Sequence, residues 1–332
     1  MITLLANKFI GTLTNLIAYT DAINLHEEGL IQSILDLGRD YDVPNGSGKV
    51  VRMSALPQVM DLDPKTSTLL SVKEPTVAEE YFPVTNYKYI QLTINQYLLR
   101  GAFTNEVAMN DLISLILLSM RRAKDIYMYE QYMSTLKAIK PNKGFNGDAA
   151  RLGVAVEVEV YDTSTVTDPV KIEAYNKLNA QNLYKAILNN MAYLQLPQEN
   201  EFTSGDGDSD KQMFNSSSLV SLVPYTVSNM LTVDALATLL NSSKITDSLS
   251  WLKTIITEDI NITVKGGSSP YNSIILMHKD KIKYGYYYQV DTSFFDASNL
   301  NLNHWLHFSY YIGVVTKLPF IAIQLKPKAV SA

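Results

Sequence analysis

The chain has 332 residues, of which 46% are hydrophobic and 18% are charged, and it contains no cysteine. This composition excludes wholesale disorder, and the lack of a thiol excludes disulfides, thiolate nucleophiles and zinc–cysteine sites. The net charge of −5 argues against a dedicated duplex-DNA-binding protein, which is usually basic. The longest strongly apolar run, 112–120, is far shorter than the roughly 20 residues that a membrane span needs.

The first third of the sequence predicts one short helix followed by a long extended region. Apolar residues at helical spacing between 25 and 37 predict the helix, which Gly38 ends. Two strands are predicted farther on, at 49–53 and at 90–94, where apolar and polar residues alternate. The segment between them contains residues that exclude a helix, namely Pro57, Pro64, Pro75 and Pro83. The simplest structure is a long two-stranded arm with an irregular middle.

The strongest signal is a long amphipathic helix over 104–139. No glycine or proline occurs between 105 and 139, and apolar residues recur there at spacings of three and four. Thr104 can cap its start, and Lys140-Pro141 ends it. At 1.5 Å per residue the helix is a rod of about 50 Å, which suggests a backbone to the whole molecule.

The remainder of the chain predicts a compact α/β lobe and then a strand-rich end. Alternating valines predict a strand at 154–160, and Asp168-Pro169 announces a helix over 171–194. A buried strand at 219–223 is followed by short helices, the second at 233–240. Four strands are predicted at the end, over 274–277, 284–290, 304–315 and 320–325. The chain has 21 tyrosines, whose apolar rings and polar tips suit contact surfaces.

Motifs for catalysis, metals or phosphate are incomplete in this sequence. Asp206–Asp210 begins like a calcium loop, but Lys211 stands where the loop needs glycine and Ser217 where it needs glutamate. The segment 46–49 resembles part of a phosphate loop, yet it precedes a strand rather than a helix. His304 and His307 fall in a predicted strand, where positions three apart face opposite sides. We therefore predict no catalytic, metal-binding or cofactor-binding residue, and no enzyme.

Three stretches carry a resemblance to a known family. The first runs from 71 to 81 and on through 90–103 into the long helix, like an extended loop that feeds a spine helix. The second combines 219–225 with 231–237, and the third combines the aromatic stretch 294–308 with the apolar stretch 319–325. In this order the chain resembles the major capsid proteins of tailed bacteriophages, which have the Hong Kong 97-type fold.

The resemblance implies an α+β fold whose parts we place by residue number. They are an N-terminal arm (1–48), an extended β-hairpin loop (49–103), a peripheral domain (104–169) with its spine helix (104–139), an axial domain (170–265), and closing strands shared by the axial and peripheral domains (266–332).

The resemblance also implies function and partners. The chain would self-assemble as pentamers and hexamers into the icosahedral head of a tailed phage that encloses double-stranded DNA. Its partners would be copies of itself, a scaffolding protein and the portal during assembly, and packaged DNA through weak non-specific contacts, with no membrane partner and no cofactor. Assembly would take place in the host cytoplasm, and the final location would be the virion. Because the chain starts at Met1, we expect no cleaved scaffold segment and a separate scaffolding protein.

Charge concentrates on the extended loop and the long helix. We hypothesise that the charged side chains there include contacts between subunits, and the candidates are Arg52, Lys65, Lys73, Glu79, Glu80, Arg100, Arg121 and Arg122. Some family members cross-link lysine to asparagine, and Lys65 and Lys73 lie in the extended loop. Lysines are common on exposed loops, however, and the sequence reveals no environment that would activate them.

Three alternatives stay open at this point. An encapsulin-like compartment shares the fold but holds enzyme cargo. An unrecognised enzyme, for example a hydrolase that uses residues 206–210, would lose a measured activity when those aspartates are changed. A tail or portal component would form a single ring of fixed symmetry rather than a closed shell.

Overall fold

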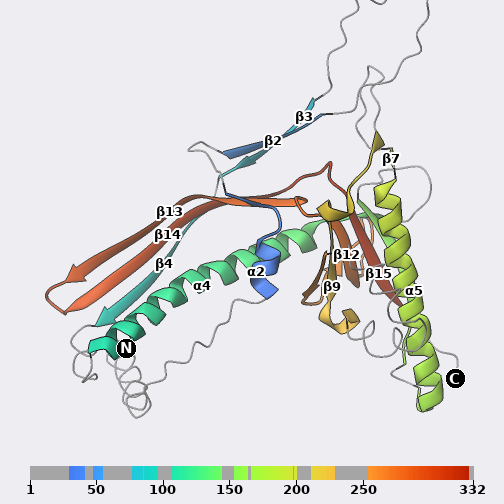
Figure 1. Ribbon diagram of the computed structural model, residues 1–332, viewed down its shortest axis with the longest axis horizontal. Helices are drawn as coiled ribbons and strands as arrows, with labels where there is room; N and C mark the ends of the chain where they lie inside the picture. The colour runs from blue at the N-terminus through green and yellow to red at the C-terminus, as the bar shows by residue number, and fades with distance from the viewer. Residues whose placement is uncertain are drawn as a thin grey trace, which may run out of the picture.

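The protein is described here by a computed structural model. The described residues are 30–41, 48–54, 77–84, 86–95, 106–143, 153–163, 166–196, 198–199, 211–228 and 253–328. Within these residues two larger sheets lie toward opposite ends of one long helix, α4, and a two-stranded hairpin stands above one of the sheets (Figure 1). The fold is therefore a mixed helix-and-sheet fold, as the sequence predicts.

Helix α4 spans Glu106–Ala138, close to the predicted bounds of 104–139. Its stripe at three-and-four spacing contributes fully buried side chains near the C-terminal end, including Met128, Tyr132 and Leu136. These side chains belong to one hydrophobic cluster that also contains residues of both sheets. The helix therefore serves as a common support for the two sheets.

The first sheet has four strands in the order β1–β13–β14–β4. The long strands β13 (Ile282–Asp296) and β14 (Asn301–Val314) form an antiparallel hairpin, and β4 (Asn86–Asn95) pairs antiparallel with β14. The short strand β1 (Arg39–Asp40) pairs parallel with β13. The N-terminal half of α4 lies along one face of this sheet (Figure 1).

The second sheet has seven strands, six of them in the order β10–β9–β12–β15–β6–β5. Strands β9 (Leu219–Pro224), β12 (Tyr271–His278) and β15 (Phe320–Lys328) lie adjacent in the middle, and β6 (Gly153–Tyr161) pairs parallel with β15. The shorter members are β5 (Asn142–Lys143), β10 (Lys253–Thr257) and β11 (Asn261–Ile262), of which β11 pairs with β12. Two further short strands, β7 (Gln198–Glu199) and β8 (Lys211–Gln212), pair with each other, and a 3₁₀ turn, η1 (Ser216–Ser218), precedes β9.

Helix α5 (Pro169–Gln195) covers one face of the seven-stranded sheet. Asp168 caps its start, because its side chain accepts a hydrogen bond of 3.0 Å from the backbone N–H of Val170. Leu183, Ile187 and Met191 on the helix pack against buried side chains of the sheet. The opposite face packs against α4 and α2, so the central strands are apolar on both sides, and all six residues of β9 are buried.

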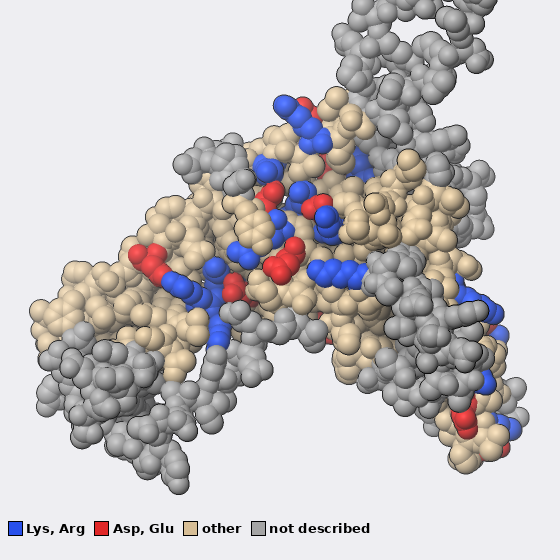
Figure 2. All heavy atoms as spheres, viewed as in Figure 1, with Lys and Arg blue, Asp and Glu red and all other residues tan. Residues whose placement is uncertain are grey.

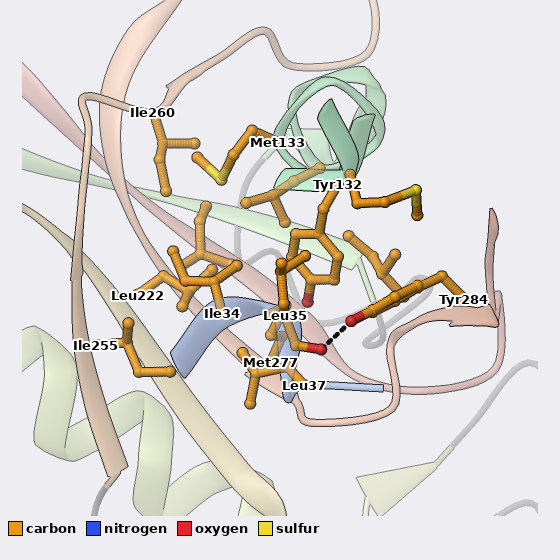
Figure 3. Packing of buried hydrophobic residues seen from close by; sticks show 14 of the residues in the cluster. Ile34, Leu35, Leu37, Tyr132, Met133, Leu222, Ile255, Ile260, Met277 and Tyr284 are labelled. Carbon is orange, nitrogen blue, oxygen red and sulfur yellow. Dashed lines mark hydrogen bonds between the residues drawn. The ribbon is translucent and has the colours of Figure 1, made fainter. Parts of the chain in front are cut away.

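Residues 30–41 pack against the core through a few apolar side chains. Helix α2 (Leu30–Leu35) and the turn after it bury Ile34, Leu35 and Leu37 among side chains of α4, β9, β10, β12 and β13 (Figure 3). The phenol hydroxyl of Tyr284 donates a hydrogen bond to the backbone oxygen of Leu35. Within the expected N-terminal arm, these residues therefore pack against the rest of the subunit, and the assignment of residues 1–48 to an N-terminal arm stays a proposal.

Two strand pairings differ from the expected layout. The strand β2 (Gly48–Ser54) pairs with β3 (Val77–Pro83), whereas β4, which was expected to complete the arm with 49–53, joins β14 instead. The alternating apolar side chains of β4 are better buried against α4 than in a free arm, and alternation alone does not identify a strand's partner. Strand β6 likewise shares a sheet with β9 and β15, so this sheet draws on ranges that were assigned to three separate domains.

Other expectations lie outside the described residues. The predicted helix 233–240 and the helix cap at Thr104 fall there, as do the prolines at 57, 64 and 75. Residues 225–228 are helical, as predicted after Pro224.

The turn after α2 supplies a test of the core. Gly38 has φ +63°, and a Cβ at this position would collide with the backbone oxygen of Ile282. We expect Gly38→Ala to lower the free energy of unfolding by at least about 2 kcal/mol, because the left-handed backbone and the collision both oppose a side chain. Chemical denaturation of the purified chain measures this change.

The control for this variant is Gly153→Ala in β6. A Cβ there would meet no atom within 4 Å, and alanine suits a strand at least as well as glycine does. Equal losses of stability in the two variants would contradict the role assigned to Gly38.

Candidate assembly surfaces

The β2–β3 hairpin is attached to the four-stranded sheet through its inner face. The ring of Phe82 stacks on that of Tyr311 in β14, with centroids 6.4 Å apart and planes inclined by 3°. Gly313 makes room for the Phe82 ring, because a Cβ at Gly313 would collide with it. Val51 and Met53 of β2 pack against the same small cluster. The hairpin therefore stands on the end of β14 rather than free in solvent.

A polar network fixes the base of the hairpin. The carboxylate of Glu80 in β3 accepts hydrogen bonds from both the backbone N–H and the hydroxyl of Thr316, which lies just after β14. On the other side of Thr316, the ammonium of Lys281 donates to the backbone oxygens of Thr316 (3.1 Å) and Leu318 (2.6 Å). Thr316 is thus held between an anion of the hairpin and a cation of the core.

Lys281 is an unusual member of this network, because only 4% of its surface is exposed. Burial lowers the pKa of Lys281 to about 8, and the nearby carboxylate of Glu80 opposes this effect. The two backbone carbonyl groups compensate part of the cost of burying the ammonium group.

A second link joins the hairpin to residues 39–41. The ammonium of Lys49 in β2 lies 3.3 Å from the carboxylate of Asp40, and the hydroxyl of Tyr311 donates to the same carboxylate at 2.6 Å. Burial, followed by this bond to Asp40, raises the pKa of Tyr311. One carboxylate of β1 therefore connects the hairpin to the four-stranded sheet.

The outer face of the hairpin is exposed. Val50, Tyr81 and Val77 are exposed apolar residues of its two strands. Between them, Arg52 and Glu79 stand opposite each other in the register and form an ion pair of 2.7 Å. Two-stranded hairpins are marginally stable alone in water, so this outer face is a candidate contact surface.

Two cations of α4, Arg121 and Lys124, lie where the helix meets β13. The ammonium of Lys124 is buried, donates to Gln289 at 3.0 Å, and lies 4.5 Å from the ring centre of Tyr286. Burial lowers the pKa of Lys124, and the carboxylate of Asp125 partly opposes this. Arg121 faces Asp291 at 3.9 Å, and both side chains are exposed. Figure 2 shows that charged side chains gather near the junction of the two sheets, whereas the outer part of the long strands is mostly uncharged.

The structure shows the surroundings, within one subunit, of five of the eight charged residues predicted to form contacts between subunits. Arg52, Glu79, Glu80 and Arg121 have partners in the same subunit, and Arg122 is half-buried on α4. The three remaining candidates, Lys65, Lys73 and Arg100, lie outside the described residues. A role of these eight side chains in contacts between subunits stays a prediction.

Sequence reasoning missed Lys281, Thr316 and Tyr311. Glu80 and Thr316 are 236 positions apart in the chain, and neither residue stands in a recognisable motif. Lys281 directly precedes β13 and stands among the charged residues Lys279, Asp280 and Lys283, so the sequence offers no signal of its burial.

The structure does not support the incomplete phosphate-loop and histidine motifs found in the sequence. Gly48 and Lys49 begin a strand and not a helix, and Lys49 is engaged by Asp40. His304 lines a hollow beside α4, whereas His307 lies on the opposite face of the sheet, as strand geometry predicts. The acidic loop 206–210 lies outside the described residues. Across the part of the chain that the structure describes, no helix is long and apolar enough to cross a membrane.

We compared the chain with families of known proteins. The model of the Phi29-like phage major capsid protein family matches residues 5–324. No curated protein matches the chain.

Solved structures give a second comparison. The capsid structure of Staphylococcus phage Andhra is 9% identical, with 92% of this chain and 87% of that chain covered and a TM-score of 0.64. The capsid structure of Cyanophage P-SCSP1u is 12% identical, with 93% and 91% covered and a TM-score of 0.57. The asymmetric unit of the bacteriophage PhiM1 mature capsid is 10% identical, with 92% and 89% covered and a TM-score of 0.57. At these identities the likeness shows a shared fold.

The network at the base of the hairpin predicts a dependence of stability on pH. The folded chain releases the proton of Lys281 near pH 8, whereas the unfolded chain keeps it to about pH 10.5. Between these values the unfolded chain binds more protons, so Lys281 makes stability rise with pH. We expect the stability of the wild type relative to Lys281→Met to rise by up to about 1.4 kcal/mol per pH unit between pH 8 and 9.5. Denaturant unfolding of both chains across this range measures the effect.

The matched control is Lys279→Met, which removes an exposed lysine two positions away. Its stability difference from the wild type, measured over the same pH range, is the reference for Lys281→Met. A difference for Lys281→Met that follows this reference would show that Lys281 has an ordinary pKa in the folded chain.

Proposed function

Since the chain belongs to the Phi29-like phage major capsid protein family, we propose that it builds the icosahedral head of a tailed phage from pentamers and hexamers of one folded subunit. The chain is a major capsid protein, it self-assembles into capsid shells, and it is a structural component of the virion. The family and the α+β, Hong Kong 97-like fold expected from the sequence are confirmed. The match over residues 5–324 is the observation that carries this function.

Within that function, we propose that the hairpin belongs to an extended loop that reaches a neighbouring subunit. Two features support this role. Its base is fixed by Phe82, Glu80 and Lys49, whereas its outer face exposes apolar side chains. A fixed base with an open outer face suits a segment that another subunit covers. The peripheral role of α4 with the four-stranded sheet, and the axial role of α5 with the seven-stranded sheet, belong to the same proposal.

The partners expected beyond the shell itself are also part of the proposal. They are a scaffolding protein and the portal during assembly in the host cytoplasm, and packaged DNA through weak contacts. The net charge of −5 supports weak contact with DNA, because tight binding requires many cations. We further propose that the chain has no catalytic activity and needs no cofactor.

Electron microscopy tests the function directly. The chain is purified alone and after co-expression with a candidate scaffolding protein, and both samples are imaged by negative stain. Closed shells are expected in at least one sample. Only monomers, or a single ring of fixed symmetry, under both conditions would overturn the proposal. Shells filled with enzyme cargo rather than nucleic acid in the native host would favour an encapsulin-like compartment.

The ion pair on the outer face of the hairpin gives a sharper prediction. In the double variant Arg52→Glu/Glu79→Arg, the two charges can still pair within the hairpin, but a neighbouring subunit meets the reversed charges. We expect the yield of shells to fall by about tenfold, as a change of about 1.4 kcal/mol in association would produce. Sedimentation of assembly reactions measures the yield.

A second exchange serves as the control. Lys137 and Glu258 also pair at 2.7 Å, away from the hairpin, and Lys137→Glu/Glu258→Lys should assemble like the wild type. Wild-type assembly of the Arg52/Glu79 exchange would show that this pair acts only within one subunit.

A further inference from the structure

The four-stranded sheet has one face on α4 and a second face that carries an uncommon set of side chains. Ile90, Leu306 and Phe308 face α4 and belong to the main hydrophobic cluster. Because successive side chains of a strand alternate, their neighbours point to the other side. There Tyr89, Gln91, Thr292, Trp305 and His307 line a common shallow hollow of about 350 Å³. We call this side the open face.

The cross-strand register extends the open face along the long strands. Tyr288 stands opposite Ser309 and Phe294 opposite Asn303, both on the side of the sheet that carries His307. Tyr87 lies two residues before Tyr89 on the edge strand. The exposed fractions are 72% for Tyr87, 64% for Tyr89, 62% for Phe294 and 51% for Tyr288. Aromatic rings therefore extend over three neighbouring strands.

The open face carries no charged side chain over most of its length. The positions facing this side are tyrosine, glutamine and threonine in 87–93, tyrosine, valine, threonine and phenylalanine in 288–294, and asparagine, tryptophan and histidine in 303–307. At the outer end Thr93 donates a hydrogen bond of 2.6 Å to Asn303. Asp296 is the last residue of β13, and its carboxylate accepts hydrogen bonds from Ser298 and Asn299 in the turn that follows.

A sheet face that meets only water usually carries polar and charged residues. Exposed aromatic rings without charges are instead typical of the centre of an interface between proteins. The same face is already covered at one end by the chain itself, where Phe82 of the hairpin stacks on Tyr311. The open face is therefore the continuation of a surface that the protein buries elsewhere.

We propose that the open face is a contact surface for a second copy of this chain in the shell, an inference that rests on the proposed function. Each copy carries a net charge of −5, and an uncharged face lets two copies meet without bringing like charges together. A nucleic acid would need cations, which this face lacks. In a shell made of identical chains, the open face of each subunit can be covered by another copy of the same chain. The hollow between Tyr89 and Trp305 receives a side chain of the neighbour as an anchor.

The fluorescence of Trp305 reports on this contact. The chain has two tryptophans, so Trp251→Phe leaves Trp305 as the only one. Its quenching by acrylamide is measured for unassembled chain and for purified shells, with shell formation verified by electron microscopy. We expect the quenching constant to fall at least about fivefold in shells, because the half-buried indole becomes fully covered.

The possible results of this quenching experiment test the contact surface and the capsid function separately. Shells with unchanged quenching of Trp305 would overturn the contact and leave the capsid function intact. A failure to form shells with any partner would overturn the function and the contact together. Quenching that falls when a scaffolding protein is added, and recovers in shells that have lost it, would assign the face to the scaffold and overturn the second-copy proposal.

A charge placed on the open face gives an independent measurement. In Tyr89→Glu, every copy would carry a carboxylate in the contact, so the yield of shells should fall at least about tenfold. Because Tyr89 is largely exposed, the denaturation midpoint of the unassembled chain should stay unchanged. The control Ser134→Glu adds the same charge at an exposed position of α4 and should assemble normally. Equal losses of yield in both variants, or normal assembly of Tyr89→Glu, would overturn the assignment.

Discussion

The arrangement depends on one amphipathic helix that has no break over 33 residues. Near the middle of α4, Tyr127 contacts Phe308 and Tyr310 of the four-stranded sheet, and its hydroxyl lies 2.9 Å from that of Tyr310. A few residues later, Tyr132 and Leu136 join a cluster with strands of the seven-stranded sheet. Because a glycine or proline would kink the helix, the uninterrupted sequence fixes the two sheets relative to each other.

The hairpin depends on that frame in a different way. Apolar contact through Phe82 holds its inner face, whereas Glu80 and Lys49 attach it to positions far away in the sequence. These polar contacts fix the orientation of the hairpin relative to the four-stranded sheet, but they bury little apolar surface. The hairpin and the open face both expose aromatic side chains, and our proposals assign each of them to a contact with another subunit.

The sequence predicted the bounds of helices and strands better than it predicted which strands pair with each other. The bounds of α4, α5, β6 and β9 follow from periodicity and capping, which are local properties. The partner of β4 and the parallel pairing of β6 with β15 depend on contacts across more than 150 positions, and alternation does not encode them. The same holds for the candidate contact residues. Local charge was enough to select Arg52 and Glu79 as candidates. The contact between Lys281 and Thr316 forms only in the folded chain, so the sequence did not indicate it.

The position of β15 has a consequence for biosynthesis. This strand is the last in the described chain, yet it lies between β12 and β6 in the middle of the seven-stranded sheet. Its residues Phe320–Ile323 are completely buried. A nascent chain that lacks them leaves a gap between two strands and exposes the apolar surface on both sides. The last strand to be synthesised in the described chain therefore completes the middle of the sheet, so this sheet closes only after nearly the whole subunit has been made.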